Sequence, residues 1–83
     1  MLNMFSVIGK VINKKEDSGL VKIRLTETTE SGDAIVLYFI CPSSIFNYID
    51  EGDMVAVKGK FTNATFNLKA DRVVIISKGG KKE

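Results

Sequence analysis

Apolar and polar side chains alternate one by one along two stretches of this sequence, and this period of two constrains the fold more than any other feature. In residues 20–28, Val21, Ile23 and Leu25 alternate with polar or charged residues. Residues 54–62 repeat the pattern, with valines opposite lysines. Because successive side chains of a strand point to opposite faces, each stretch predicts an antiparallel strand with one buried face.

Three further stretches complete a set of five predicted strands: residues 4–12, 34–41 and 67–76. The composition agrees with this assignment, since Val, Ile and Thr total 22 residues whereas Ala and Leu total nine. β-branched side chains are stiff at χ1 and pack well on a pleated surface, so this ratio favours sheet over helix. The sequence therefore predicts an all-β domain.

A short helix is predicted between the third and fourth strands, at about residues 43–50. Pro42 ends the third strand because it cannot donate to a ladder, and Ser43 or Ser44 then caps the helix. Five antiparallel strands with a helix at this point are typical of the OB fold, a small, partly open Greek-key barrel. An SH3-like barrel is the alternative, but it has no reason to place a helix there.

The charge of the chain is concentrated at its end. The net charge is +2, and residues 78–83 account for all of it, whereas residues 1–77 are neutral. We expect one domain at residues 1–77, followed by a short, basic, flexible tail at residues 78–83. A chain of 83 residues buries only about 60% of its unfolded surface, so a second chain covering part of it would add stability.

Several classes of protein are excluded by what the chain lacks. It has no His and only one Cys, which excludes metal sites rich in nitrogen or sulfur ligands and nucleophilic catalysis by Ser-His or Cys-His pairs. We therefore expect neither an enzyme nor a cofactor or metal, and the carboxylates Asp50, Glu51 and Asp53 are interpreted as part of a solvated turn. No apolar run approaches the roughly 18 residues of a membrane span, and no signal peptide is recognisable, so a cytoplasmic protein without a membrane partner is expected.

Three segments, in the same order along the chain, resemble bacterial single-stranded DNA-binding proteins. Residues 3–11 resemble the opening strand of that family, which reads Asn, apolar residues, Gly, a base and an apolar residue. Residues 48–61 resemble its helix end and fourth strand, where an aromatic residue, a Gly turn and a second Gly recur at this spacing. Residues 70–76 resemble its closing strand. The family's Trp residues, its long basic hairpin before the last strand and its acidic, Phe-tipped tail are missing here.

The resemblance implies an OB-fold protein that binds single-stranded DNA with little regard to sequence, in replication, recombination or the maintenance of mobile elements. It also implies self-association into dimers or tetramers, and replication or helicase proteins as further partners. Two alternatives stay open: an OB-fold protein-interaction module, such as a primosome or helicase accessory factor, and an RNA-binding OB protein.

Basic residues gather on the predicted strands, whereas most acids fall in the connections, so a neutral domain can still carry a basic track for phosphates. Aligned on the family, Tyr38 lies near a base-stacking aromatic and Phe66 lies at a stacking-tryptophan position. Phe61 shares its parity with Val55 and Val57 and is predicted to face the core. Each of these residues also has a structural alternative. The strand lysines could only keep the sheet surface soluble, Tyr38 could be an interface residue, and Phe66 could plug the end of the barrel. The predicted nucleic-acid-binding residues are Lys22, Arg24, Tyr38, Lys58, Lys60, Phe66 and Lys69.

The first predicted strand is apolar on both faces, and a small barrel can cover only one of them. An exposed apolar strip usually marks an interface. The family resemblance indicates the same, since its members pair through their first strands. The predicted oligomer interface consists of Met4, Ser6, Ile8, Lys10 and Ile12.

Overall fold

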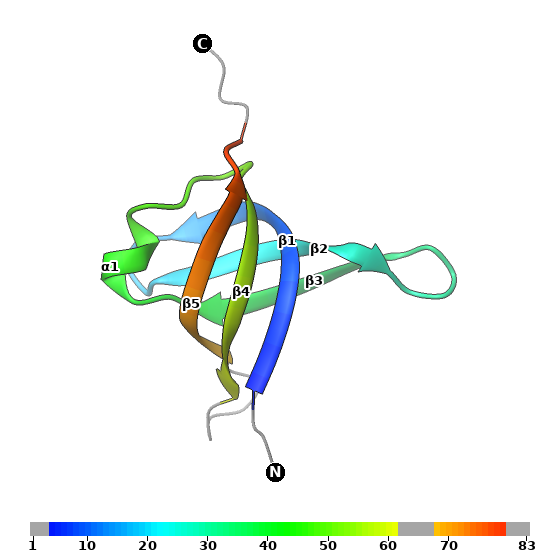
Figure 1. The fold of residues 1–83 in the computed structure, drawn as a ribbon, viewed down its shortest axis with the longest axis horizontal. Helices are drawn as coiled ribbons and strands as arrows, with labels where there is room; N and C mark the ends of the chain where they lie inside the picture. The colour runs from blue at the N-terminus through cyan, green and yellow to red at the C-terminus, as the bar shows by residue number, and fades with distance from the viewer. Residues whose placement is uncertain (1–3, 62–67, 80–83) are drawn as a thin grey trace.

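In the described part of the chain, five strands and one short helix follow one another in the order that the sequence predicts (Figure 1). The computed structural model describes residues 4–61 and 68–79. The elements are β1 (Met4–Lys15), β2 (Leu20–Thr28), β3 (Ala34–Ile40), α1 (Ser43–Phe46), β4 (Met54–Phe61) and β5 (Leu68–Ser77). The five-stranded fold with one helix between the third and fourth strands is thereby confirmed.

The strands form a closed barrel in the order β1-β2-β3-β5-β4. β1 closes one side because its residues 9–15 pair with β2 while its residues 4–10 pair with β4, both antiparallel. The opposite side is closed far less tightly. There β3 and β5 run parallel, and Ile40–Lys69 is their one ladder pair within residues 4–61 and 68–79. Among the described residues, the junction of β3 and β5 thus has the shortest ladder of the barrel.

The inward side chains of all five strands meet in one apolar core. α1 contributes Phe46 to it, and the segment after α1 contributes Ile49. Burial raises the pKa of the Cys41 thiol to about 11, although the nearby charge of Lys14 lowers it, so the thiol is protonated at neutral pH. The fully or nearly fully buried apolar residues are Val11, Val21, Ile23, Phe39, Cys41, Phe46, Ile49, Val55, Val57 and Ala70.

The helix α1 is shorter than predicted and is capped differently. It spans four residues instead of the expected 43–50, and Ser43 and Ser44 lie inside it, so the prediction of a serine cap is wrong. Pro42 is the N-cap, with φ −61° and ψ 149° and no capping side chain. The carbonyl of Pro42 accepts the backbone N–H groups of Ile45 and Phe46 at 2.9 and 2.8 Å. Beyond this turn, the Asn47 N–H donates to the Ser43 carbonyl at a longer 3.4 Å, and the helix ends.

Two glycines permit close contact between neighbouring strands. A Cβ on Gly9 would lie 2.5 Å from the carbonyl oxygen of Arg24 in β2. A Cβ on Gly59 would collide with the carbonyl oxygen of Lys69 and lie 2.9 Å from the Ala70 Cα in β5. A backbone without side chains is needed where strands approach this closely in a small barrel.

The acidic turn before β4 is not the solvated turn that the sequence predicts. Asp53 is fully buried, and its carboxylate accepts hydrogen bonds from the backbone N–H groups of Asp50, at 2.8 Å, and Gly79, at 2.7 Å. The ammonium group of Lys78 donates to the same carboxylate at 2.8 Å and to that of Asp50 at 3.0 Å. Lys78 and Gly79, two residues of the predicted tail, are thus bound to the barrel.

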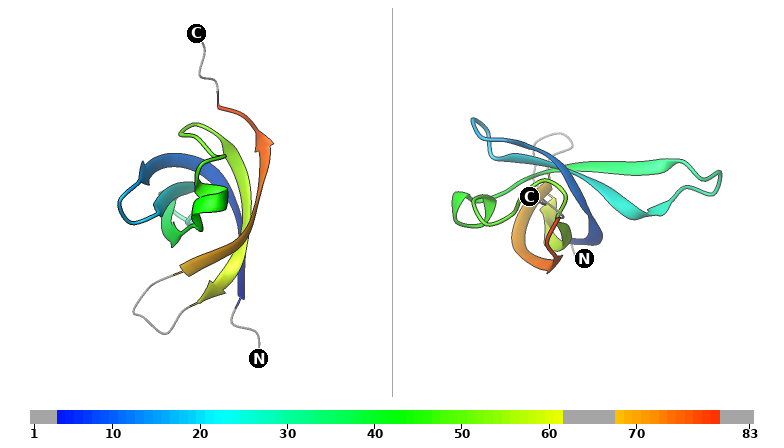
Figure 2. Two further views of the ribbon diagram at one scale, coloured as in Figure 1. Left: turned by 90° about the vertical axis from the view of Figure 1, so that its left-hand side faces the viewer. Right: turned by 90° about the horizontal axis from the view of Figure 1, so that it is seen from above.

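The β2–β3 hairpin projects well beyond the barrel, as the right-hand view of Figure 2 and the ribbon in Figure 1 show. Its tip is ordered by hydrogen bonds between Thr29 and Asp33, from the Thr29 N–H to the Asp33 carbonyl at 2.9 Å and from the Asp33 N–H to the Thr29 hydroxyl at 3.0 Å. Residues 25–34 contain three exposed acids and no base. The hairpin is therefore a negatively charged arm.

Among residues 4–61 and 68–79, no helix has the length and apolarity needed to cross a membrane. Over the same residues, no three side chains of the metal-ligating types gather closely enough to hold a metal ion.

Candidate nucleic-acid interface

The outer surface of β2 and β3 places a cation over an aromatic ring. Lys22 and Tyr38 are direct cross-strand partners, and the Lys22 Nζ lies 5.5 Å from the centroid of the Tyr38 ring. Tyr38 is 46% exposed, so a large part of its side chain is accessible to a ligand. Arg24 pairs with the exposed Val36 in the next outward row. Three of the predicted binding residues therefore share one surface.

A second basic surface lies on the outer face of β4 and β5. Lys60 pairs directly with Lys69, and Lys58 pairs directly with Arg72. Like charges placed opposite each other on a sheet destabilise it, by roughly 0.2–1 kcal/mol for each pair. In the part of the chain that the structure describes, Lys78 is the only base that forms ion pairs, with Asp50 and Asp53. No carboxylate there forms an ion pair with any of the four bases of β4 and β5.

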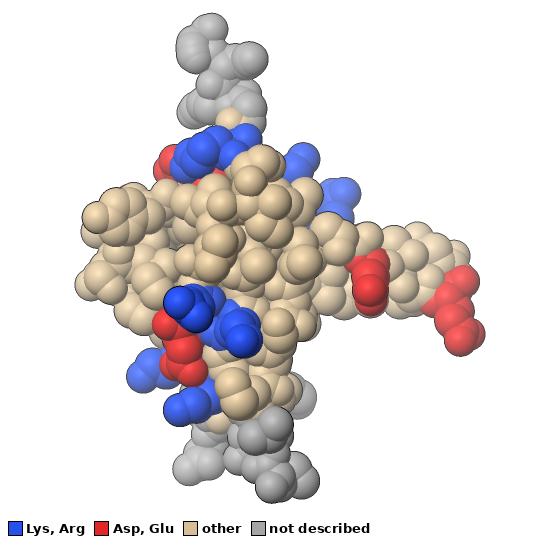
Figure 3. Space-filling model, in the orientation of Figure 1, with Lys and Arg blue, Asp and Glu red and all other residues tan. Residues whose placement is uncertain are grey.

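Figure 3 shows blue basic side chains gathered over β4 and β5, with red acidic atoms beside them, whereas the projecting hairpin carries red. Asp71 is the one acid in the sequence of β5. Arg72 was missed by the sequence interpretation. Strand parity alone could not reveal it, because a register shift between Lys58 and Gly59 sets which residue of β5 lies opposite Lys58.

Phe61 corrects the sequence prediction. It has the inward parity of Val55 and Val57, both fully buried, yet it is 54% exposed. Phe61 is the last residue of β4, beyond the rows that fill the core, so its parity no longer leads into the barrel. Its ring lies edge-on to that of Phe5, with 6.0 Å between the centroids and 62° between the planes.

Phe61 and its cross-strand partner Leu68 face a groove beside the junction of β3 and β5. The groove has a volume of about 490 Å³. It lies between the end of the β4–β5 pair and the outer half of β3. Its lining consists of Val36, Leu37, Tyr38, Phe61 and Leu68. The predicted residue Phe66 lies outside the described residues.

The predicted oligomer residues lie on β1, beside the second basic surface. On the outer face, Ser6 pairs with Lys58 and Met4 pairs with Lys60, so the two predicted surfaces are neighbours on one sheet. Met4 and Ile8 are each 46% exposed, as the two-faced pattern of this strand predicts.

An apolar row crosses this sheet. Ile8 pairs with Ala56, and Ala56 pairs with Val74, while the exposed Ile76 follows on β5. Lys10 is exposed further along β1. Ile12 is half-buried and lies at the register shift between Val11 and Asn13.

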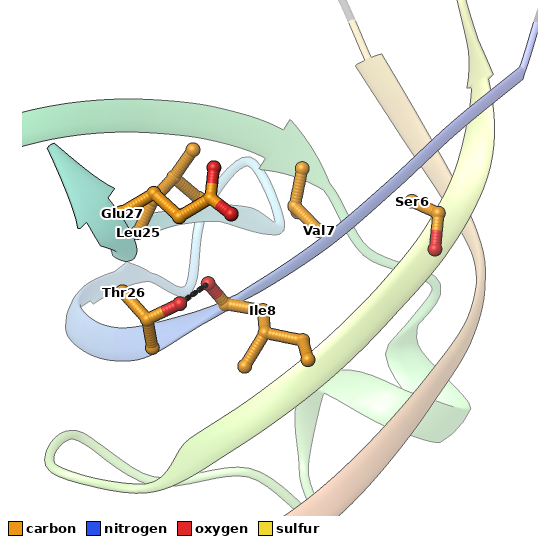
Figure 4. A pocket seen from close by; sticks show the side chains of 6 residues that line it. All are labelled: Ser6, Val7, Ile8, Leu25, Thr26 and Glu27. Atoms are coloured by element: carbon orange, nitrogen blue, oxygen red, sulfur yellow. Dashed lines mark hydrogen bonds between the residues drawn. The ribbon is translucent and has the colours of Figure 1, made fainter. Parts of the chain in front are cut away.

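The first five described residues of β1 have a strand partner on one edge only. Pairing with β2 begins at Gly9, whereas residues 4–8 pair with β4 alone. β1 and β2 diverge there around a pocket of about 250 Å³, lined by Ser6, Val7, Ile8, Leu25, Thr26 and Glu27 (Figure 4). The Thr26 hydroxyl makes a long hydrogen bond of 3.5 Å to the Ile8 carbonyl across it. The edge of β1 is thus open to pairing with another strand.

No model of a known protein family and no curated protein matches this sequence. Among solved structures, the chain is similar to the mitochondrial single-stranded DNA binding protein Rim1 from S. cerevisiae, with a TM-score of 0.70 and 14% identity over 95% of this chain and 99% of that chain. A second structure of Rim1 gives a TM-score of 0.60 and 14% identity over 99% and 100% of the two chains.

The second single-stranded DNA binding protein of Mycobacterium smegmatis, SSBb, is similar with a TM-score of 0.56 and 20% identity, over 92% of this chain and 90% of that chain. The chain therefore shares the fold of these structures, a five-stranded OB fold.

Proposed function

We propose that this protein binds single-stranded DNA without catalytic turnover and with little regard to sequence. The observation that carries the proposal is the pair of directly opposed like charges on β4 and β5, Lys60 with Lys69 and Lys58 with Arg72. Such pairs cost stability in the free protein and become favourable when phosphates lie over them. The similarity to structures of single-stranded DNA binding proteins supports the same function.

Single strands suit this surface better than duplexes. The exposed ring of Tyr38 can stack only on a base whose face is free, and Lys22 beside the ring can neutralise the adjoining phosphate. Stacking accepts any base because each has a π-face. The exposed apolar neighbours on these strands, such as Val36, carry no group that could read a base edge by hydrogen bonding.

Fluorescence anisotropy with labelled oligo-dT, duplex DNA and RNA at several salt concentrations tests the proposal. We expect a preference for oligo-dT whose affinity falls steeply with salt, because each phosphate contact releases counterions. Absence of binding even at low salt would favour the protein-interaction module instead. Tighter binding of RNA than of DNA of the same sequence would favour an RNA-binding protein.

The double substitution Lys60→Gln and Lys69→Gln is expected to weaken binding and to flatten its salt dependence. The slope of log K against log salt should fall by about 0.7 for each phosphate that the variant no longer neutralises. Removing the opposed charges should leave the unfolding free energy unchanged or raise it by a few tenths of a kcal/mol. Anisotropy titrations and urea unfolding measure the two effects.

Lys15→Gln provides the matched control, since Lys15 is an exposed strand lysine whose cross-strand partner is the uncharged Leu20. It should leave the salt slope almost unchanged. An equal change of slope in both variants would show that Lys60 and Lys69 make no special contact.

We also propose that the protein forms a homodimer through the open edge of β1, with Met4, Ser6, Ile8, Lys10 and Ile12 at or beside the contact. The support is the unpaired edge of residues 4–8 together with the exposed Met4 and Ile8. Edge-to-edge pairing would join the β1 strands of two protomers. It would place the β4–β5 basic surface of each protomer on one continuous sheet. A strand of DNA long enough to reach both would bind more tightly than to either alone.

A role in replication, recombination or mobile-element maintenance in the cytoplasm, with replication or helicase proteins as further partners, is the biological setting that we propose for this binding. Co-purification of such proteins with the wild-type chain, and not with a variant that no longer binds single-stranded DNA or no longer dimerises, would test it.

A further inference from the structure

The acidic arm, residues 25–34, has no partner for its charges within its own molecule. Glu27, Glu30 and Asp33 are all exposed, and none of them forms an ion pair within the described residues. The tip is held by the hydrogen bonds between Thr29 and Asp33, and the Ser31 hydroxyl adds a longer one of 3.4 Å to the Asp33 carboxylate. Because the backbone of the tip is already ordered, a contact made by this tip requires little further ordering of the chain.

The outer face of β4 and β5 has the opposite charge and the same lack of a partner. Lys60 lies opposite Lys69 and Lys58 lies opposite Arg72, while Asp71 is the one acid of β5. Directly opposed residues have Cβ atoms about 4.5–5.5 Å apart. Since each of the two oxygen atoms of a carboxylate accepts hydrogen bonds, one carboxylate can bind both bases of such a pair. The face therefore suits carboxylates as well as phosphates.

The arm of a molecule does not reach this face of the same molecule. β3 pairs with β5 at Ile40, whereas the arm joins β3 at Ala34, the other end of the strand. At about 3.3 Å per residue, the two ends of β3 lie about 20 Å apart. The arm then extends further away from the barrel (Figures 1 and 2). A contact between the arm and the basic face must therefore join two molecules.

We propose that the acidic arm of one molecule docks on the outer face of β4 and β5 of a second copy. The carboxylates of Glu27, Glu30 and Asp33 then bind the opposed bases, which are otherwise left without a counter-charge. Every molecule carries both halves of the contact on different parts of its surface, so the contact is heterologous. A hairpin tip offers a small, polar interface, and the contact is consequently weak and strongly dependent on salt.

The contact also regulates DNA binding, and this part of the inference rests on the proposed function. The opposed bases cannot hold a carboxylate of a second copy and a phosphate of DNA at the same time. Single-stranded DNA should therefore dissolve the assembly, whereas protein in excess over DNA should associate through its arms. The arm thus covers basic surfaces that no DNA occupies.

Sedimentation velocity at about 10 mM salt, where the Debye length is about 30 Å, compares the wild-type protein with an arm variant. The arm variant carries Glu27→Gln, Glu30→Gln and Asp33→Asn. We expect its association constant to be roughly 10- to 100-fold lower, since each exposed ion pair contributes up to about five-fold. Raising the salt to about 0.3 M should remove the difference. The proposed β1 contact is common to both proteins and leaves the comparison unaffected.

The matched control carries Glu16→Gln, Asp17→Asn and Glu51→Gln, which replace three exposed acids outside the arm and change the net charge by the same amount. It should associate like the wild-type protein. An equal loss in the control would show that total charge drives the association and would overturn the proposal. So would equal association of the wild-type protein and the arm variant at low salt.

A mixing experiment tests which two surfaces meet. The face variant, Lys60→Gln with Lys69→Gln, should associate as poorly as the arm variant. An equimolar mixture of the two variants should regain association, because intact arms then meet intact basic faces. No gain on mixing would overturn the docking of the arm on this face. Circular dichroism checks each fold, and Glu27→Gln with Glu30→Gln, which keeps the Asp33 hydrogen bonds, replaces an arm variant that does not fold.

Competition is measured by adding a short oligo-dT, which reaches one barrel only, to the wild-type protein at low salt. The assemblies should dissolve as the oligonucleotide binds. Assemblies that persist with oligo-dT bound would overturn the regulation of DNA binding by the arm. If the assemblies form through the arm but no oligo-dT binds, the contact stands and the proposed function fails.

Discussion

Replacing Asp53 by Ala is expected to lower the free energy of unfolding by about 3 kcal/mol, because two backbone N–H groups lose a charged, buried acceptor and a hydrogen bond to a charged group contributes about 1.5–3 kcal/mol. These are the N–H groups of Asp50 and Gly79, both directed at the fully buried carboxylate of Asp53. The substitution also removes the partner of Lys78, which joins the end of β5 to this turn. Urea unfolding at neutral pH measures the loss.

Asp50→Ala is the matched control, since the Asp50 side chain is 67% exposed and shares only Lys78 with Asp53. A surface pair of this kind contributes at most about 1 kcal/mol. If both substitutions cost the same, the buried carboxylate is not what anchors the end of β5.

The same carboxylate makes stability depend on pH. Burial raises the pKa of Asp53, but hydrogen bonds from Lys78, Gly79 and Asp50 outweigh it and hold the pKa below its usual value of 3.8. Because the folded-state pKa is lowered, this contribution to stability is complete above about pH 4 and is lost as the pH falls through the folded-state pKa. In Asp53→Asn this part of the acid loss should be absent, which unfolding curves between neutral and acid pH would detect.

Replacing Ile8 by Lys is expected to convert the proposed dimer into the 9.1 kDa monomer at micromolar concentration and to weaken binding of long single strands by ten-fold or more. In a two-fold symmetric contact through β1, the introduced lysine of each protomer would approach that of its partner, and the two charges would repel each other. Sedimentation equilibrium and anisotropy with a long and a short oligonucleotide measure the two effects. The short strand, which reaches one barrel only, should lose little affinity.

Ile76→Lys is the matched control, because Ile76 is 53% exposed against 46% for Ile8 but lies on β5, two strands away from the open edge. It should leave the dimer intact. If Ile76→Lys dissociates the assembly instead, the contact is made by the outer face of the sheet. A wild-type monomer under these conditions would refute the dimer.

Strand positions and facing could be predicted from the sequence because they depend on local alternation. β2 begins and ends where the pattern of Val21, Ile23 and Leu25 predicts, and Lys22 and Tyr38 point outward together. That Lys22 and Tyr38 are direct cross-strand partners could not be predicted, because it depends on the register between β2 and β3. The length of α1 could not be foreseen, since Ser43 and Ser44 are as compatible with the first helical turn as with a cap.

The features that parity could not reveal depend on contacts between distant parts of the chain. Lys58 lies opposite Arg72 only because β4 and β5 shift register beside it. Asp53 is buried because Lys78 and Gly79, 25 and 26 residues later, supply donors to it. Phe61 follows the alternation of β4 and is still 54% exposed, because it is the last residue of the strand and lies beyond the rows that fill the core.

The acidic β2–β3 arm gives this nearly neutral protein a lasting separation of charge. Glu27, Glu30 and Asp33 extend away from the barrel, while the opposed bases of β4 and β5 lie on the barrel itself. A molecule with such a charge moment is turned by the field of a polyanion before the two touch, with its basic surface leading and the arm trailing. Orientation at encounter raises the fraction of productive collisions, so a net charge of only +2 understates how fast the proposed association with DNA would be at low salt.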